Sequence, residues 1–269
     1  IIGGGIVGAT LALKLAQDNK PVTLIDARPK RDEADWQQVL GQRDARVYAL
    51  SLASIELLKE VGAWQKIAAS ERKADYSQMQ VWQLNGMGEL LFGDSDDSNV
   101  STGNSNVANN NNNAKPKMLG SMVEPAVIEY ALWQRLSAPD VSQYLTVIDG
   151  QKVIDMDWLG ATQGYRVTLD NDTVINANLL VGADGRGSFV RKQAGIELDV
   201  LDYNQTAICC AIQTEKPHLA TARQAMLPTG TLALLPLADI TDEDKANPQH
   251  WQSIVWTLPR NQALALLEE

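Results

Sequence analysis

Three glycines near the start of the chain have the spacing of a phosphate-binding turn. The chain opens Ile1-Ile2-Gly3-Gly4-Gly5-Ile6-Val7-Gly8, so Gly3, Gly5 and Gly8 form a G-x-G-x-x-G pattern. In such a turn the first glycine permits a tight bend, the second lets a phosphate approach the backbone, and the third lets the next helix pack closely. The N-terminus of that helix then faces the anion. A Gly-rich turn without a ligand is the alternative interpretation.

The residues after the glycines favour a dinucleotide-binding unit. Val7, Leu11 and Leu15 recur at helical spacing, and the run 22–25 predicts a buried strand that ends at Asp26. Asp26 follows the glycines by about 20 residues, where a dinucleotide-binding fold places an acid against the adenosine ribose. A solvated acid at a strand end is the alternative.

A second glycine-containing segment, 182–191, is the most specific in the chain. Residues 179–181 predict a short buried strand that leads into Gly182-Ala183-Asp184-Gly185, and a helix is expected from Ser188. Asp184 could accept hydrogen bonds from sugar or ribityl hydroxyls, while Gly185 lets a flat ligand approach. An ordinary turn with a capping Asp is the alternative.

Composition narrows the remaining classes of function. The chain has 269 residues, enough for one large or two moderate domains. Its net charge of -10 argues against nucleic acid as a main partner, and against docking on anionic lipid by charge alone. Cys209 and Cys210 are adjacent and not spaced as metal ligands, so we expect a buried, reduced pair and no metal site. His218 and His250 lie in polar loops and receive no catalytic role.

Helices and strands alternate in the first part of the chain, and antiparallel strands dominate the later part. This order predicts an α/β fold in which a nucleotide-binding domain is interleaved with a sheet domain. We expect a loop over 27–45, a helix from Val47 to Gly62, a hairpin over 77–92 and a flexible low-complexity insertion over 93–117. Further helices are expected from Pro125, from Ser188 and near Asn261. Further strands are expected at 145–148, 152–158, 165–169, 173–175, 206–213, 223–227, 231–236 and 253–258.

Taken together, these segments resemble the aromatic-ring FAD monooxygenases of the p-hydroxybenzoate hydroxylase superfamily. The family's first fingerprint matches Gly3–Gly8 with Asp26, its Asp-Gly motif matches Ala183–Arg191, and its Arg-bearing segment before a helix matches Asp44–Ser51. Within the superfamily the chain most resembles the ubiquinone-biosynthesis hydroxylases, which act on polyprenylated phenols. That closer likeness rests on residues 46–51, 57–64, 123–124, 130–133, 232–237 and 253–256.

The resemblance implies a Rossmann-like FAD-binding domain of the glutathione reductase type, interleaved with a mixed or antiparallel β-sheet substrate domain. The FAD-binding domain would comprise residues 1–76 and 121–200. The substrate domain would comprise 77–120, including the insertion, and 201–269.

It also implies a set of residues that bind FAD. Gly3, Gly5 and Gly8 would seat the pyrophosphate and Asp26 the adenosine ribose. Arg46 would contact the phosphates or flavin, and Glu124 the ribityl chain. Val153 would contact the adenine, and Asp184 with Gly185 the flavin's sugar-alcohol portion. A solvated Arg at a helix start and a helix N-cap are the alternatives for Arg46 and Glu124. No catalytic residue is assigned.

In that family NAD(P)H reduces the FAD and O2 supplies the oxygen atom that is added to an electron-rich phenol ring. The protein contributes orientation and a dry pocket, which is why no acid–base pair need stand out in the sequence. The expected partners are a prenylated phenol and O2, with peripheral membrane or quinone-synthesis complex association as a further option. The expected location is the cytoplasm, with a peripheral position at the inner membrane as the alternative.

One departure from the family is clear. Its third motif, Gly-Asp-Ala-Ala-His before a Pro- and Gly-rich turn, does not occur in these 269 residues. Only two residues precede Gly3, so the first strand is short, and we expect a fragment truncated at its C-terminus. Two rivals stay open: another FAD oxidoreductase of the same fold, such as a prenyl reductase or amine oxidase, and a non-catalytic nucleotide-binding module in a quinone-synthesis complex.

Overall fold

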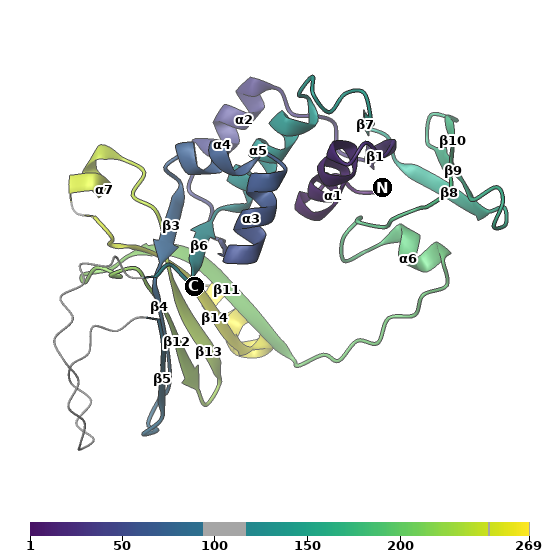
Figure 1. The fold of residues 1–269 in the computed structure, drawn as a ribbon. Helices are drawn as coiled ribbons and strands as arrows, with labels where there is room; N and C mark the ends of the chain where they lie inside the picture. The colour runs from purple at the N-terminus through teal and green to yellow at the C-terminus, as the bar shows by residue number, and fades with distance from the viewer. Residues whose placement is uncertain (94–116, 247, 269) are drawn as a thin grey trace, which may run out of the picture. The chain divides into compact units, whose positions relative to one another are not determined.

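The computed structural model describes residues 1–93, 117–246 and 248–268. The chain forms two compact units, each built from three separate segments (Figure 1). The first comprises Ile1–Arg43, Ile55–Ser70 and Pro125–Asp202, and the second Asp44–Ser54, Glu71–Glu124 and Tyr203–Glu269. Three stretches that were grouped above with the FAD-binding domain therefore belong to the second unit: residues 44–54, 71–76 and 121–124. The expected insertion lies, apart from its two end residues, outside the described residues.

Parallel pairing organises the start of the first unit. Strand β1 (Val22–Asp26) pairs in parallel with β7 (Leu145–Asp149), residue for residue from Val22 opposite Leu145. Ile2 forms parallel bridges to both Ile25 and Gly182. The N-terminal residues therefore lie between β1 and the segment that leads to Asp184, which is the strand–helix–strand arrangement predicted from the glycine turn.

Helices in the first unit pack through small and aliphatic residues. Helix α1 (Ile6–Gln17) buries Ala9, Ala12, Leu13 and Ala16, and it contacts α5 (Pro125–Leu136). The remaining helices of this unit are short. They are α2 (Glu33–Leu40), most of α3 (Leu52–Glu60), α4 (Trp64–Ala69) and α6 (Phe189–Gln193).

Helix α2 corrects the expected loop over 27–45. Asp32 is its N-cap, and its carboxylate accepts the N–H of Asp35 at 2.8 Å. Only Trp36 of the helix is buried, so the apolar periodicity that reveals a helix in a sequence is missing. The capping acid and the acidic first turn were the available signal.

An antiparallel sheet completes the first unit. Its order is β10 (Val174–Ala177), β9 (Tyr165–Leu169), β8 (Val153–Trp158). A core cluster joins this sheet to the glycine turn and to α6; it consists of Ile2, Ile25, Val153, Val167, Leu169 and Val190. The buried strand predicted over 179–181 is wrong, because these residues form no strand and Leu179 is 74% exposed.

The second unit contains two sheets. The larger has the order β11-β14-β13-β12-β4-β5, and the smaller β2-β6-β3. The strands of the larger sheet are β4 (Gln78–Gln83), β5 (Glu89–Phe92), β11 (Gln205–Gln213), β12 (Thr221–Leu227), β13 (Gly230–Pro236) and β14 (Trp251–Pro259). Those of the smaller are β2 (Tyr48–Ser51), β3 (Lys73–Tyr76) and β6 (Gly120–Val123). The β4–β5 hairpin confirms the pattern over 77–92.

Strand β2 corrects the start of the helix expected from Val47. Residues 48–51 pair with β6, from Tyr48 opposite Val123 to Ser51 opposite Gly120, and α3 begins only at Leu52. A cluster of Ala74, Met122 and Ala222, with Leu235 against it, joins the two sheets of this unit. Helices α7 (Asp242–Ala246) and α8 (Arg260–Glu268) complete it, and the latter confirms the helix expected near Asn261.

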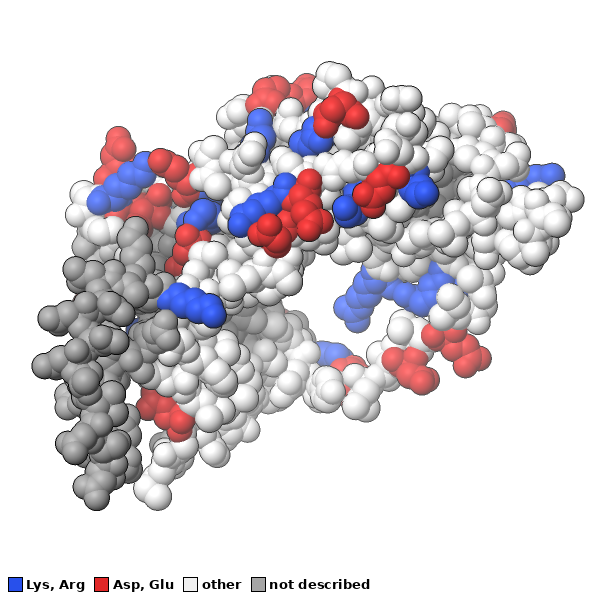
Figure 2. All heavy atoms as spheres, viewed as in Figure 1, with Lys and Arg blue, Asp and Glu red and all other residues white. Residues whose placement is uncertain are grey.

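Three surface and composition features bear on partners. Acidic and basic side chains are interspersed on the face drawn in Figure 2. Cys209 and Cys210 are free and half-buried, less buried than expected. Among the described residues no helix combines the length and apolarity that crossing a bilayer requires, and no cluster of His, Cys, Asp or Glu has the arrangement of a metal site.

Candidate functional site

The two glycine-containing bends meet in the first unit. Ile2 N donates to the carbonyl oxygen of Val181 at 2.9 Å, and Ala183 N donates to that of Ile2 at 2.7 Å. Gly3 has φ +105°, and a Cβ there would lie 2.3 Å from the carbonyl oxygen of Ala183. No other residue type fits at Gly3 without moving one of the bends, so glycine is what permits their close approach.

A pocket of about 440 Å³ opens where the bends meet, which is within the range of roughly 300–1,000 Å³ typical of small-molecule sites. Both bends line it. Its walls include Gly3, Gly5, Asp26, Arg28, Glu129, Val153, Asp184, Gly185 and Gly187. Six of the nine residues predicted to bind FAD thus line this one pocket.

Gly5 and Gly8 have different surroundings. A Cβ on Gly5 would meet no atom within 4 Å, so the backbone at the start of α1 is open toward the pocket. No side chain caps this end of α1, which leaves its N–H groups available to an anion. A Cβ on Gly8 would lie 1.9 Å from the carbonyl oxygen of Gly3. Gly8 therefore permits close packing of the helix on the turn, as predicted for the third glycine.

Asp26 anchors the turn from the end of β1. Its side chain is 6% exposed. One carboxylate oxygen accepts the N–H of Gly4 at 2.6 Å, and the other accepts the N–H of Arg28 at 2.7 Å. The pKa of Arg28 is raised mainly by its side-chain hydrogen bond to Asp26. A role for Asp26 at the ribose stays a prediction, because the structure shows the carboxylate bound to the protein's own donors.

Arg28 is a pocket residue that the sequence reasoning missed. Its guanidinium lies 3.2 Å from Asp26 and 3.5 Å from Glu129, and 52% of its side chain is exposed. A cation that is oriented by two carboxylates and half open to solvent is suited to meet an anionic ligand. Its position two residues after the strand-end acid was the available signal.

Asp184 caps the helix that follows it. Ser188 Oγ donates to one carboxylate oxygen at 2.6 Å, and the N–H groups of Phe189 and Val190 donate to the other at 2.6 and 3.1 Å. Burial acts to raise the pKa of Asp184, but these hydrogen bonds outweigh it and the pKa is lowered. The capping interpretation is therefore confirmed. Asp184 also lines the pocket, so the predicted flavin contact stays open as a second role.

Gly185 and Val153 complete the pocket residues that were predicted. Gly185 has φ +83°, and a Cβ there would meet no atom within 4 Å. Val153 is buried in the core, and the two residues that precede it, Gln151 and Lys152, also line the pocket. Backbone hydrogen bonds from Val153 to an adenine stay a prediction.

Arg46 and Glu124 belong to the second unit and are absent from the pocket lining. Arg46 has a side chain that is 68% exposed, as expected of a ligand-binding or solvated Arg. Glu124 is buried with 3% of its side chain exposed, and its carboxylate pairs with Arg72 at 2.5 Å and accepts the N–H of Asp44. Its role toward a cofactor stays a prediction.

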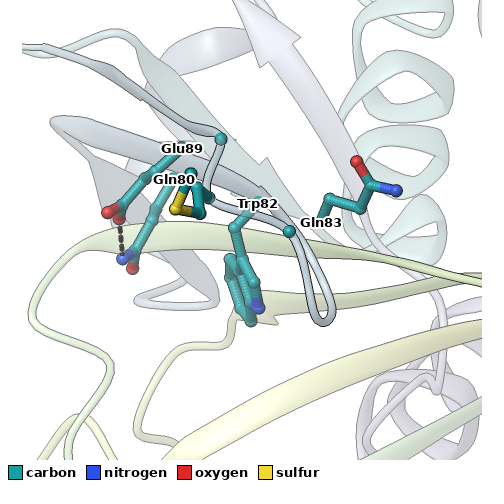
Figure 3. A pocket seen from close by; sticks show the side chains of 7 residues that line it. Gln80, Trp82, Gln83 and Glu89 are labelled. Atoms are coloured by element: carbon teal, nitrogen blue, oxygen red, sulfur yellow. Dashed lines mark hydrogen bonds between the residues drawn. The ribbon is translucent and has the colours of Figure 1, made fainter.

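A second hollow of about 320 Å³ lies on the β4–β5 hairpin of the second unit. Figure 3 shows Gln80 and Glu89 joined by a hydrogen bond, with Trp82 beside them. None of the residues predicted to bind FAD lines it. A small amide-and-carboxylate hollow on a hairpin turn lacks the convergent polar groups of a cofactor site.

The geometry of the first pocket fits a pyrophosphate-containing ligand. Its features are an uncapped helix N-terminus, an open glycine at that terminus and an exposed guanidinium on the pocket wall. The chain matches the family model described as "FAD binding domain" over residues 1–245. It belongs to the FAD-binding domain family.

Relatives place this member of the FAD-binding domain family near quinone hydroxylases. It is 33% identical to the "3-demethoxyubiquinol 3-hydroxylase" of Escherichia coli (strain K12), over 95% of this chain and 56% of that protein. It is 30% identical to the "Ubiquinone biosynthesis monooxygenase COQ6, mitochondrial" of Mus musculus, over 99% of this chain and 51% of that protein. The chain thus spans about half the length of the relatives it matches.

Solved structures confirm the predicted fold class. The Pseudomonas aeruginosa protein described as "pqsL, a probable FAD-dependent monooxygenase" superposes with a TM-score of 0.69 at 14% identity, covering 100% of this chain and 62% of that one. A 2-methyl-3-hydroxypyridine-5-carboxylic acid oxygenase superposes with a TM-score of 0.61 at 15% identity, covering 96% of this chain and 58% of that one. At these identities the likeness concerns the fold.

Proposed function

We propose that this chain is the FAD-binding and substrate-binding part of a monooxygenase that uses NAD(P)H and O2 to hydroxylate a polyprenylated phenol in ubiquinone biosynthesis. The pocket formed by the two bends would hold FAD. Gly3, Gly5 and Arg28 would face its pyrophosphate, with Asp26 on the ribose side and Asp184 on the flavin side. When bound, FAD supplies the redox and oxygen chemistry of the reaction.

One observation carries the proposal: Gly3 and Asp184, from opposite ends of the first unit's sequence, line the same pocket. The two motifs would be unrelated features if they did not converge. The open backbone at Gly5 and the membership in an FAD-binding family support the cofactor, and the quinone hydroxylase relatives support the substrate class. Arg46 and Glu124 remain proposed contributors from the second unit.

The proposal can be tested with the protein in its full natural length. Purified protein should be yellow and should oxidise NADH or NADPH faster when a short-chain prenylated phenol is added. Mass spectrometry should find the phenol heavier by one oxygen atom, and O2 uptake should match the product formed. When the reaction is run under isotopically labelled O2, the label should appear on the ring.

Other outcomes point to the rivals. Yellow protein that yields hydrogen peroxide without a hydroxylated ring would favour another FAD oxidoreductase of this fold. Colourless protein that binds nucleotide without turnover would favour a non-catalytic module. Co-purification with other quinone-synthesis proteins, or sedimentation with vesicles, would test the proposed complex and peripheral membrane association at the cytoplasmic side of the inner membrane.

A further inference from the structure

The β4–β5 hairpin gathers exposed apolar side chains at one edge of the large sheet of the second unit (Figure 1). All of β5 is exposed, including Leu90 at 60%, Leu91 and Phe92. In the turn, Met87 is 106% exposed, and Leu84, which follows β4, is exposed as well. Single apolar residues in water are common, but a group of them on one hairpin marks a surface that a partner covers.

The exposed apolar residues occupy both faces of the hairpin. Successive residues of a strand point to opposite faces of the sheet, so Leu90 and Phe92 lie on one face and Leu91 on the other. Figure 3 shows the same alternation in β4, where the side chains of Trp82 and Gln83 point away from each other. A partner protein that packed on one face of the hairpin would therefore leave apolar groups of the other face in water.

The hairpin is also nearly free of charge. Residues 77–93 contain one charged side chain, Glu89, in a chain of which 21% is charged. The Glu89 carboxylate accepts a hydrogen bond from the side-chain amide of Gln80. These residues include no lysine or arginine, so an anionic lipid head group would meet no cation on the hairpin. The surface fits an apolar environment that is entered without help from charge.

A lipid bilayer is the partner that fits a hairpin with these properties. Fluid acyl chains surround an inserted turn on all sides, so they cover Leu90 and Leu91 together although these point to opposite faces. The insertion is shallow, because β5 is the last strand of its sheet and its outer edge has no strand partner among the described residues. Open sheet edges are not tolerated in hydrocarbon, so the turn reaches only the boundary between head groups and acyl chains. Tryptophan is favoured at that depth, and Trp82 lines the hollow on this hairpin.

We propose that the β4–β5 hairpin docks the protein on a lipid bilayer through apolar contacts that need no anionic lipid, with Met87 and Leu90 among the side chains that enter. The inference rests on the function proposed above, because a polyprenylated phenol is itself a lipid and is reached from the surface of a bilayer. It names the part of the chain that makes the membrane contact and the force that holds it there.

The test is co-sedimentation of the full-length protein with vesicles of phosphatidylcholine, which carry no net charge. We expect the parent to bind them, and Met87→Ser to lower the partition coefficient about 10-fold, as for one apolar side chain withdrawn from the bilayer. The double variant Met87→Ser/Leu90→Thr should lower it about 100-fold. Vesicles that also contain phosphatidylglycerol should bind the parent no more tightly. Raising the ionic strength from about 0.1 M to about 1 M, which screens charge attraction, should not release it.

Val174→Thr is the matched control for Leu90→Thr. Val174 is 52% exposed and lies on β10, which is likewise the edge strand of an antiparallel sheet, but in the first unit. This variant should bind the vesicles within about 2-fold of the parent, as a surface substitution away from the contact. Met87 and Leu90 are exposed, so their variants should keep the parent's melting temperature, which is recorded for all four variant proteins.

Three results would overturn the inference. They are a parent protein that does not sediment with phosphatidylcholine vesicles, a double variant that binds them as well as the parent does, and binding that requires phosphatidylglycerol and is lost at high ionic strength. If the double variant instead converted an oligomer of the parent to monomers without changing vesicle binding, the hairpin would be an interface between copies of the chain. Hydroxylation of a short-chain phenol is measured without vesicles, so failure of the docking and failure of the proposed function are seen separately.

Discussion

Gly5 and Gly3 have different reasons for being glycine. The space where the Gly5 side chain would begin is empty, whereas that of Gly3 is filled by the backbone of Ala183. Sequence spacing assigns both to one motif, but only the structure separates a residue needed for the ligand from one needed for the fold. Substitution at Gly5 is therefore the cleaner probe of cofactor binding.

The first prediction concerns Gly5→Val. A branched side chain at this open position should occupy the space that the pyrophosphate needs, while the extended backbone at Gly5 accepts a side chain without strain. We expect folded, colourless protein with FAD affinity lowered by 100-fold or more, roughly the loss of 3 kcal/mol. Gly88→Val is the control, because a Cβ at Gly88 would also meet no atom within 4 Å and Gly88 lies outside this pocket. Yellow Gly5→Val protein would contradict the site.

The second prediction concerns acid sensitivity at His218. This residue is 4% exposed, its Nδ1 accepts the N–H of Ala220 at 3.1 Å, and burial lowers its pKa. A histidine with a lowered folded pKa binds fewer protons folded than unfolded, so stability falls as pH drops below the ordinary value of about 6.5. Leu219 and Ala220 both have positive φ, so a lost Nδ1 acceptor should release a strained turn.

The measurement is the melting temperature between about pH 8 and pH 5, since the ordinary histidine pKa lies in that window. The parent protein should lose stability toward the acid end, and His218→Gln should show a shallower decline. His250→Gln serves as the control, because His250 is the other histidine of the chain and its Nδ1 lies 2.6 Å from the carbonyl oxygen of Thr214, away from the strained turn. Equal slopes in all three proteins would count against the role of His218.

At the scale of elements, the sequence predicted helices from the periodicity of their apolar residues. It missed the elements that depend on a capping residue or on pairing with a distant strand. Helix α5 was predicted because it buries an apolar stripe, Ile128, Leu132 and Leu136. Helix α1 was predicted from the spacing of Val7, Leu11 and Leu15, but none of these three is among its buried residues and Val7 is 74% exposed. Helix α2 has one buried residue and β2 has none, so neither carries an apolar pattern. Strand β2 exists because β6 pairs with it, a long-range event that local residue types cannot report.

The third prediction concerns Asp184 and helix α6, which Asp184 caps. Asp184→Ala removes an acceptor for three donors and should destabilise the protein by about 0.5–2 kcal/mol, as for lost helix caps. Asp184→Asn keeps one acceptor oxygen and should destabilise it less. Urea unfolding of the apoproteins measures both. If Asp184 also binds the flavin portion of FAD, Asp184→Asn should lower FAD affinity by more than its measured loss of stability accounts for. Unchanged FAD affinity would show that Asp184 serves only as a cap.

Acid unfolding offers a separate check on the same carboxylate. The pKa of Asp184 is lowered in the folded protein, so its contribution is present above the ordinary Asp pKa of about 3.9 and is lost as pH falls through the lower folded value. The parent protein should therefore lose more stability than Asp184→Asn as the pH is taken from about 5 to about 2.

At the scale of the whole molecule, the predicted site falls into two groups. The residues near Gly3 and Asp184 were predicted to meet because the family resemblance assigns both motifs to one FAD. The strand expected before Asp184 does not form, and a bridge between Ile2 and Gly182 brings the two bends together instead. Arg28 escaped notice because it belongs to no fixed spacing pattern. Arg46 and Glu124 were predicted by resemblance alone, and the structure adds a physical link between them through Asp44.

The interleaved units lead to the fourth prediction, on stabilisation by the cofactor. The pocket lies wholly within the first unit, whose segments alternate along the chain with those of the second. A ligand that binds only the folded state at 100 times its dissociation constant adds about 2.7 kcal/mol of stability. For a body of this size that should raise the melting temperature by about 5 to 10 °C.

Differential scanning of the full-length protein with and without FAD measures this shift, and removal of FAD by dialysis should reverse it. Gly5→Val should show no shift, whereas Gly88→Val should match the parent. If the two units melt in separate transitions, the one that contains the pocket should move with FAD, because a ligand stabilises the structure that binds it. If FAD still raised the melting temperature of the Gly5→Val protein, the cofactor would bind elsewhere. The two glycine bends would then not form its binding site.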